Sequence, residues 1–323
     1  MSGLILVAFT PVFLWIKYLH ENAGGSAPAR HIWPALLLGV AISYPAMTIE
    51  DFLARSPLVS FAWLYESFVV EAVTLGGTFA HYFLRAYVIG GFVEEFLKLM
   101  AVLAVLWVFR ASVRPVSLLL IAVAVSGGFA AIENILISAN AADWGRTALL
   151  RTLVSLPTHI FLGVFMGFFL VLAWKWRWRY AMACLAFLVP ALLHGTSNYL
   201  LAIGETQLGP PPGAVHAAAR FCFGMLLLAE ALLAMVAVSR VSRFGAGAKR
   251  AVRALGRDAP SVAFWTTVAL FVGIIGLVNL LSLGLQVVGV RFPTNVNTTF
   301  VIGATSLVYA FVIGGHARRA AGD

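Results

Sequence analysis

The chain has 323 residues, of which 61% are hydrophobic and only 11% are charged. Soluble domains carry roughly twice that share of charged residues, so this composition excludes a soluble globular protein and predicts an integral membrane protein. The formal net charge of +9 would also suit a nucleic-acid-binding protein, but the basic residues gather in short loops between apolar runs. That distribution is typical of cytoplasmic loops in a lipid bilayer and argues against nucleic acid as a partner.

Several apolar runs approach the ~20 residues that a membrane-spanning helix needs. They predict an all-α, polytopic transmembrane helix bundle of about nine spans, within limits of about eight and ten. The runs cover 3–19, 32–49, 84–109, 115–138, 152–174, 181–203, 217–238, 262–288 and 297–315. Residues 58–80 are also apolar but contain Glu66 and Glu71, and we expect a helix there that lies on the membrane surface or dips into it.

The loops between these runs alternate in charge. Lysine and arginine gather after the third, fifth, seventh and ninth runs, and the intervening loops hold fewer of them. The positive-inside rule then places the N-terminus outside and the C-terminus in the cytoplasm. We expect three parts: N-terminal spans with the possible interfacial helix in 1–83, a four-span core in 84–203, and C-terminal spans in 204–323 with a basic cytoplasmic loop at 239–261.

The four spans of this core carry polar residues at membrane depth. They are Glu94, Glu95 and Lys98 in the first, Glu133 and Asn134 in the second, His159 in the third, and His194 and Asn198 in the fourth. An ionisable side chain at such depth is costly, so it usually faces a polar interior and serves a function. Glu94 with Lys98, and His194 with Asn198, are four residues apart and share a helix face. Glu133 has no basic neighbour in its own span and must be protonated or find a partner elsewhere.

Depth in the membrane connects these residues. With a rise of about 1.5 Å per residue, Glu94 lies about 15 Å and His194 about 14 Å below the outer surface. On the same measure His159 lies about 10 Å down, and Glu133 and Asn198 about 8 Å. Unrelated polar residues would be spread over both leaflets, whereas all five fall in the outer half. We therefore expect one functional site in a polar cavity that opens outward.

Carboxylates beside histidines support hydrolysis. Glu94 would take a proton from water, with Glu95 and Lys98 tuning it, while His194 and Asn198 stabilise the oxyanion on the attacked carbonyl group.

Two alternatives use the same residues. Glu133, His159 and His194 could hold zinc and leave an open position for water; without a metal, Glu133 and His159 would position the water. Buried carboxylates and histidines also form proton or cation relays. A proton- or cation-coupled membrane transporter is therefore the alternative function.

The motifs occur in a characteristic order. EExxK covers 94–98, GFAAxEN covers 128–134, His159 is followed by Gly163 and Gly167, and HxxxN covers 194–198. Over about residues 85–203 this order resembles the PrsW family of intramembrane proteases. More distantly it is similar to the CAAX-processing type II endopeptidases, whose motifs are EExxxR, FxxxH and HxxxN. Glu133 stands here where that FxxxH motif has its histidine, and Lys98 stands one residue before their arginine.

The resemblance implies an endopeptidase that acts on a membrane-anchored protein within the lipid bilayer. Substrates of the family include anti-sigma factors, which are cleaved near the outer face of the membrane. We therefore expect a protease in a bacterial cytoplasmic membrane, of either the glutamic type or the metalloprotease type.

Overall fold

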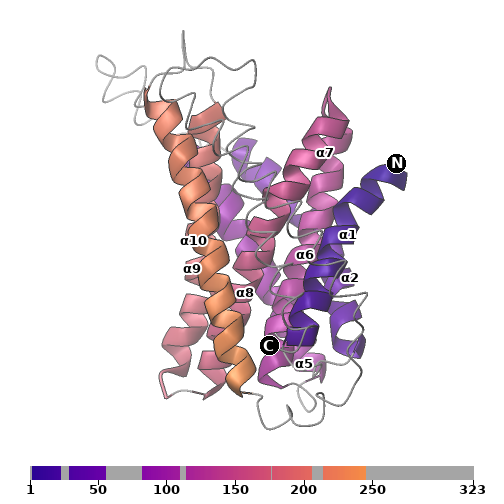
Figure 1. Ribbon diagram of the computed structural model, residues 1–323, viewed down its shortest axis with the longest axis vertical. Coiled ribbons are helices and arrows are strands. Elements are labelled where there is room, and N and C mark those ends of the chain that lie inside the picture. Colours follow the sequence, from indigo (N-terminus) through magenta and orange to yellow (C-terminus); the bar gives the residue numbers. More distant parts are fainter. Residues whose placement is uncertain are drawn as a thin grey trace, which may run out of the picture.

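The computed structural model describes residues 2–22, 29–55, 82–109, 114–175, 177–205 and 214–244, and these residues form helices joined by turns. Figure 1 shows the helices standing side by side along the longest axis of the molecule. They are α1 (Ser2–Asn22), α2 (Ala29–Arg55), the π-helix η1 (Leu84–Val93), α5 (Glu94–Phe109), α6 (Pro115–Ala139), α7 (Trp144–Leu153), α8 (Ser155–Lys175), α9 (Arg179–Glu205) and α10 (Ala214–Phe244). No strand occurs among the described residues, so the all-α prediction is confirmed for them.

Six helical stretches of the described residues are long and apolar enough to cross a membrane. They are Gly3–His20, Ala29–Ala54, Val116–Ala139, Trp144–Lys175, Arg179–Gly204 and Ala218–Val241, and each overlaps one expected span. The expected span at 84–109 is helical throughout, but it is divided between η1 and α5. The expected spans at 262–288 and 297–315, the expected helix at 58–80 and most of the basic loop at 239–261 lie outside the described residues.

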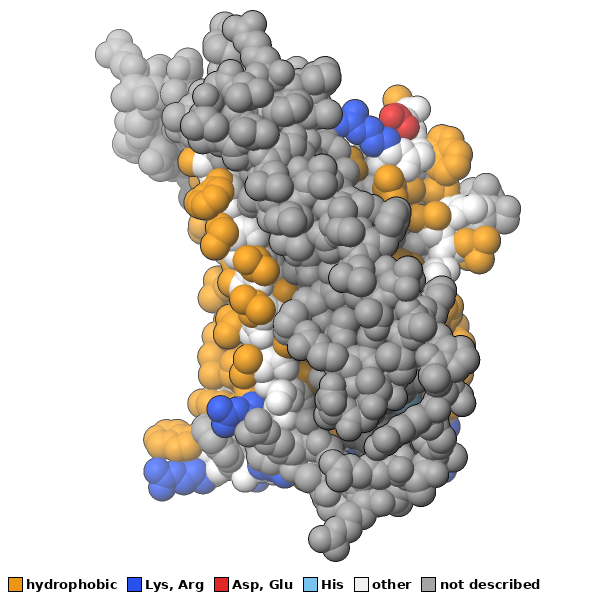
Figure 2. All heavy atoms as spheres, in the orientation of Figure 1, with side chains coloured by type: hydrophobic (Ala, Val, Ile, Leu, Met, Phe, Trp, Pro, Cys, Tyr) orange, Lys and Arg blue, Asp and Glu red, His pale blue; other side chains and the backbone are white. Residues whose placement is uncertain are grey.

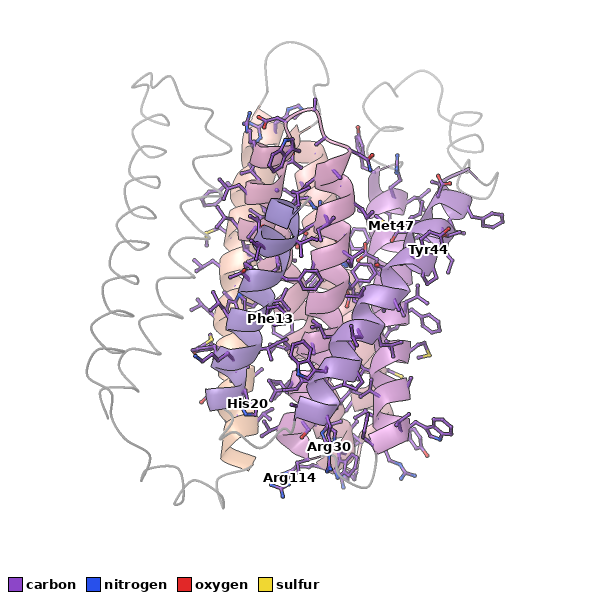
Figure 3. All side chains as sticks on the ribbon, turned by 90° about the vertical axis from the view of Figure 1, so that its right-hand side faces the viewer. Phe13, His20, Arg30, Tyr44, Met47 and Arg114 are labelled. Carbon is purple, nitrogen blue, oxygen red and sulfur yellow. The ribbon has the colours of Figure 1, made fainter. Side chains whose placement is uncertain are left out.

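The surface of the described helices suits a bilayer. Figure 2 shows hydrophobic side chains over the length of the bundle, with lysine and arginine gathered towards its ends. Arg30 and Arg114 lie at the same end as His20 (Figure 3), as the predicted alternation of the loops requires. α7 lies at the end where the chain begins (Figure 1).

The central helix of the bundle is α6, whose residues from Val116 to Ala131 are all buried. α1, α2, α5 and α8 all pack against it. Glycines let α2 approach it closely: a Cβ atom on Gly39 would collide with the carbonyl oxygen of Val125, and one on Gly128 with that of Leu36. Small residues at such crossings bring helix backbones into contact in membrane proteins.

The π-helix η1 leads directly into the first acidic pair. The backbone N–H of Glu94 donates to the carbonyl oxygens of Gly90 and Gly91, where the wide π turn passes into α5. Gly91 packs against α9, since a Cβ atom there would lie 2.5 Å from the carbonyl oxygen of Ala191. π-helical segments are rare and often occur at functional sites. Here the segment places Glu94 and Glu95 in the first turn of α5, both buried.

Candidate active site

Glu94, Glu95 and Lys98 form a buried ionic cluster at the start of α5. The Lys98 ammonium donates to Oε2 of Glu94 at 3.0 Å and to Oε1 of Glu95 at 2.7 Å. Lys98 is completely buried, and its Nζ atom lies 4.2 Å from the centre of the Phe129 ring on α6. A buried charge without a partner is strongly destabilising, so each member of this cluster needs the others.

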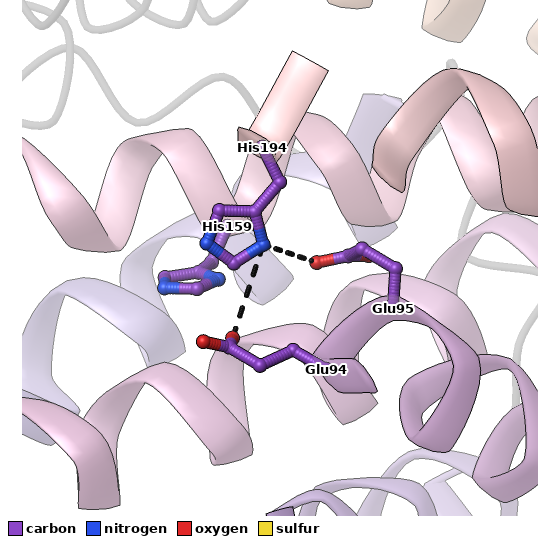
Figure 4. Close-up of side chains that lie close together, drawn as sticks. All are labelled: Glu94, Glu95, His159 and His194. Carbon is purple, nitrogen blue, oxygen red and sulfur yellow. Dashed lines mark hydrogen bonds and ion pairs between the residues drawn. The ribbon is translucent and has the colours of Figure 1, made fainter. Parts of the chain in front are cut away.

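His194 on α9 joins the cluster from the opposite side. Its Nδ1 atom lies 3.0 Å from Oε1 of Glu95 and 3.8 Å from Oε2 of Glu94 (Figure 4). A carboxylate can only accept hydrogen bonds, so Nδ1 of His194 carries a proton and donates it to Glu95. His159 on α8 lies beside it, with the two rings perpendicular and their centres 4.9 Å apart.

His159 connects the cluster to Glu133. Its Nδ1 atom lies 2.9 Å from Nζ of Lys98, and its Nε2 atom lies 3.0 Å from Oε2 of Glu133. An ammonium has no lone pair, so Nδ1 of His159 accepts from Lys98 and the ring proton sits on Nε2, where it donates to Glu133. The neighbours of the ring thereby select one tautomer.

Arg151 on α7 is the basic partner that Glu133 lacks within its own helix. Its Nη2 atom donates to Oε1 of Glu133 at 2.6 Å and to Oγ of Ser155 at 3.2 Å. Its Nε atom donates to Oδ1 of Asn134 at 2.8 Å. A continuous series of hydrogen bonds, which we call the polar network, therefore runs through Arg151, Glu133, His159, Lys98, Glu95 and His194.

Sequence reasoning missed Arg151, although a signal was present. It stands at the end of a loop that is otherwise poor in basic residues, next to the start of an apolar run. The short helix α7 brings Arg151 back to α6, where it contacts Glu133 and Asn134. Asp143 caps this helix: its side chain accepts from the backbone N–H of Arg146 and so satisfies one of the free donors at the helix start.

The structure brings six of the eight predicted site residues into direct contact: Glu94, Glu95, Lys98, Glu133, His159 and His194. Asn134 is attached through Arg151. Asn198 is half-buried one turn beyond His194, and its Nδ2 atom lies beside Gly90, 2.9 Å from where a Cβ atom would stand. Among the described residues Asn198 makes no hydrogen bond to the polar network.

Two further acids near the site had no predicted role. Glu50 on α2 interacts electrostatically with Glu94, Glu133 and Lys98, and its Oε1 atom is buried without a hydrogen-bond partner among the described residues. Glu230 on α10 accepts a hydrogen bond from Oγ of Ser197 at 3.4 Å. Each stands within or at the end of an apolar run, which is the same signal that identified Glu94.

The donor atoms that could hold a metal ion come from Glu94, Glu95, His159 and His194. One donor atom from each lies within 4.8 Å of the others, and all four residues are buried. Two imidazoles and two carboxylates form a donor set that suits zinc. The expected set of Glu133, His159 and His194 differs from this one, because Glu133 lies on the far side of His159 and is paired with Arg151.

Lys98 occupies the region that such an ion would need. Its ammonium is hydrogen-bonded to Glu94, Glu95 and His159, which are three of the four candidate ligands. A metal ion and the lysine ammonium would then bind the same carboxylate and imidazole atoms, and at such short range the two cations would repel each other strongly. A metal ion would therefore have to displace the lysine ammonium from them.

Comparison with known proteins identifies the family. A family model described as "PrsW family intramembrane metalloprotease" matches residues 27–229, which include every residue of the polar network. The proteins named Protease PrsW from Oceanobacillus iheyensis and Halalkalibacterium halodurans are 29% and 26% identical to the chain, each over 204 residues. Each alignment covers 62% of this chain and 84% of the relative. No solved structure matches the chain.

The Protease PrsW of Bacillus subtilis is also similar, with 25% identity over 204 residues, 62% of this chain and 84% of the relative. The family match covers more than half of the chain and all four helices that supply the glutamates and histidines of the polar network. The chain therefore belongs to the PrsW family of intramembrane proteases and is an integral membrane enzyme.

Proposed function

We propose that this enzyme is an endopeptidase that cleaves a membrane-anchored protein near the outer face of the membrane, with Glu94 as the general base that activates water. One observation carries the choice of base. Glu95 is completely buried and binds both Lys98 and His194 closely, whereas the side chain of Glu94 is 7% exposed and approaches His194 only to 3.8 Å. Glu94 therefore has the greater freedom to accept a proton from water.

The reaction then follows from the positions of the donors. Glu94 accepts a proton from water as the water oxygen attacks the peptide carbonyl carbon. His194 acts in its doubly protonated form: its Nδ1–H donates to Glu95 and its Nε2–H donates to the oxyanion that develops, with Asn198, one turn further along α9, as the second donor. When the carbon–nitrogen bond breaks, Glu94 returns the proton to the leaving amine nitrogen. Glu95 and Lys98 hold this arrangement in place throughout.

The outer part of the polar network has a supporting role in this proposal. Arg151 and Glu133 fix the ring of His159, and His159 in turn accepts a hydrogen bond from Lys98. Catalytic groups must stay within a fraction of an ångström of their productive positions. We infer that Glu133, Asn134 and His159 orient the lysine and the water rather than contact the reacting atoms.

Glu94, Glu95, His159 and His194 are the residues that would hold a metal ion. Zinc bound there would supply a Lewis acid and a water molecule of lowered pKa. Elemental analysis of the purified enzyme, combined with chelation, tests this part of the proposal. Stoichiometric zinc whose removal abolishes cleavage would support the metalloprotease type, and an active preparation free of metal would support the glutamic type.

The proposed function is tested with purified protein in liposomes and a single-span reporter substrate. Glu94→Gln keeps the shape of the side chain but removes the base, and His194→Ala removes the oxyanion donor. We expect both variants to remain folded and to lose cleavage by a factor on the order of a hundred or more.

Asp143→Asn is the matched control, because it also neutralises one carboxylate but lies on the exposed end of α7 and keeps a good helix cap. This variant should cleave the reporter normally. Full cleavage by both Glu94→Gln and His194→Ala would contradict the proposed catalytic roles of these two residues. Ion-coupled flux through the liposomes without any proteolysis would point to the transporter alternative instead.

A further inference from the structure

The π-helix η1 and the helix α9 run antiparallel past the candidate site. Glu95, just after η1, contacts His194, whereas Gly90, five residues earlier, lies beside Asn198, four residues later. Between these two contacts the backbones themselves meet, because a Cβ atom on Gly91 would lie 2.5 Å from a carbonyl oxygen of α9 and 3.0 Å from a backbone nitrogen. Backbone contact of this kind leaves little freedom in how the two segments lie against each other.

Gly90 is buried and leaves a space that the side chain of Asn198 fills. A Cβ atom on Gly90 would lie only 2.9 Å from Nδ2 of Asn198, well inside van der Waals contact. The backbone at Gly90 is helical, a conformation that every residue except proline adopts readily. Glycine is therefore required here for space and not for backbone freedom.

The two proposed oxyanion donors are held in different ways. The ring of His194 is fixed by a hydrogen bond to Glu95 at 3.0 Å. Asn198 is half-buried, and within the described part of the chain its amide is placed by packing against Gly90 and makes no hydrogen bond to the polar network. A donor stabilises an oxyanion only if it already stands in position before the reaction.

We propose that Gly90 is a positioning residue, which sets the place of the Asn198 amide by providing the space in which that amide rests. The inference rests on the proposed function, in which Asn198 is the second donor to the oxyanion. The carbonyl oxygen of Gly90 also accepts from the backbone N–H of Glu94. One glycine thus connects the general base with a donor on another helix.

Gly90→Ala tests this role by adding one methyl group beside the amide. The amide ends a flexible side chain and can move aside at little cost, and alanine is a better helix former than glycine, so thermal stability should stay the same or rise. A shift of about 1 Å can cost on the order of a hundred-fold in rate. We expect kcat on the reporter substrate to fall on the order of ten- to a hundred-fold, with KM unchanged.

Gly91→Ala and Gly145→Ala are matched controls that add the same methyl group. At Gly91 the methyl group would meet backbone atoms of α9, which cannot move aside, so this variant should lose thermal stability. At Gly145 on α7 no described atom lies within 4 Å of the new Cβ position, so this variant should stay stable and cleave normally. Gly90→Ala with wild-type kcat, or as unstable as Gly91→Ala, would overturn the proposal.

A double-mutant cycle tests whether Gly90 acts through Asn198. Asn198→Ala removes the amide and should lower kcat on the order of a hundred-fold. Adding Gly90→Ala to it should cause no further loss, and losses that add would contradict the proposal. A reduced kcat in Asn198→Ala but not in Gly90→Ala would overturn this inference alone. Wild-type kcat in Asn198→Ala would remove Asn198 from the proposed function and overturn this inference with it.

Nuclear magnetic resonance of the asparagine side-chain amides tests the contact without any substrate. The signal that is missing from Asn198→Ala identifies the amide of Asn198. This signal should shift in Gly90→Ala and stay in place in Gly145→Ala; an unshifted signal in Gly90→Ala would overturn the proposal. If the wild type cleaved nothing but the signal shifted, the proposed function would fail while the positioning contact would be supported.

Discussion

The two ends of the polar network hold the same kind of ion pair in different surroundings. At the α5 end, Lys98 and Glu95 are completely shielded, and two carboxylates share one ammonium. At the α7 end, the side chains of Arg151 and Glu133 are 23% and 15% exposed. Water can replace a lost partner at the second end but has little access to the first. Breaking the pair should therefore cost much more at α5 than at α7.

The largest effect is expected from Lys98→Met. It leaves two buried carboxylates without their shared cation, and we expect the free energy of unfolding to fall by about 3–5 kcal/mol and cleavage to be lost. Unfolding in detergent, followed by circular dichroism, measures the first effect. Combining Lys98→Met with Glu95→Gln removes one charge of each sign and should recover much of the stability without recovering cleavage. A stable single variant would show that the α5 end is not enclosed.

A smaller effect is expected from Arg151→Gln. We expect a loss of about 1–2 kcal/mol in stability, since water can solvate part of Glu133, and a fall in cleavage on the order of ten-fold as His159 loses its support. Guanidinium ion, added well below denaturing concentrations, should restore part of the cleavage because this end is open.

Rescue by an added cation also tests whether the two ends of the polar network differ in their access to solvent. A small alkylammonium ion should not restore cleavage to Lys98→Met, because its binding position is enclosed. Equal rescue at both positions, or none at either, would contradict the difference in access that their burial indicates.

The smallest effect is expected from Tyr87→Phe, which serves as the reference against which the losses in Lys98→Met and Arg151→Gln are compared. The Tyr87 hydroxyl lies 2.8 Å from Oγ1 of Thr196 and joins η1 to α9 by a neutral hydrogen bond. Losing one neutral hydrogen bond should lower the free energy of unfolding by about 1 kcal/mol and change cleavage little. A larger loss of cleavage than in Arg151→Gln would show that η1, rather than the polar network, governs the site.

Much of the described fold could be predicted because the length of an apolar run and the width of a bilayer constrain each other. The expected spans at 115–138 and 181–203 correspond to Val116–Ala139 and Arg179–Gly204. The π-helix before Glu94 could not be predicted, since it depends on how Gly91 packs against a helix a hundred residues later in the chain. Which side of the membrane each loop faces stays a prediction.

The sequence predicted most of the residues that lie together in the candidate site but not all of their contacts, and their catalytic roles stay a prediction. Glu94, Lys98, His159 and His194 could be singled out because an ionisable side chain inside an apolar, membrane-spanning run is energetically costly. The partner of Glu133 could not be inferred, since Arg151 reaches it only through the turn between α6 and α7. The donor atoms that lie close together come from Glu94, Glu95, His159 and His194, a grouping that spacing along the sequence does not reveal.

The contact between α2 and α6 has a consequence for how the bundle can move. At Gly39 and Gly128 each helix receives the carbonyl oxygen of the other into a notch where a side chain would otherwise stand. Sliding α2 by one turn would bring Ala35 or Ser43 in place of Gly39 to the Val125 carbonyl, where no Cβ atom fits, so the contact favours one register between the two helices. Glu50 on α2 is thereby held at one height relative to Glu133 on α6.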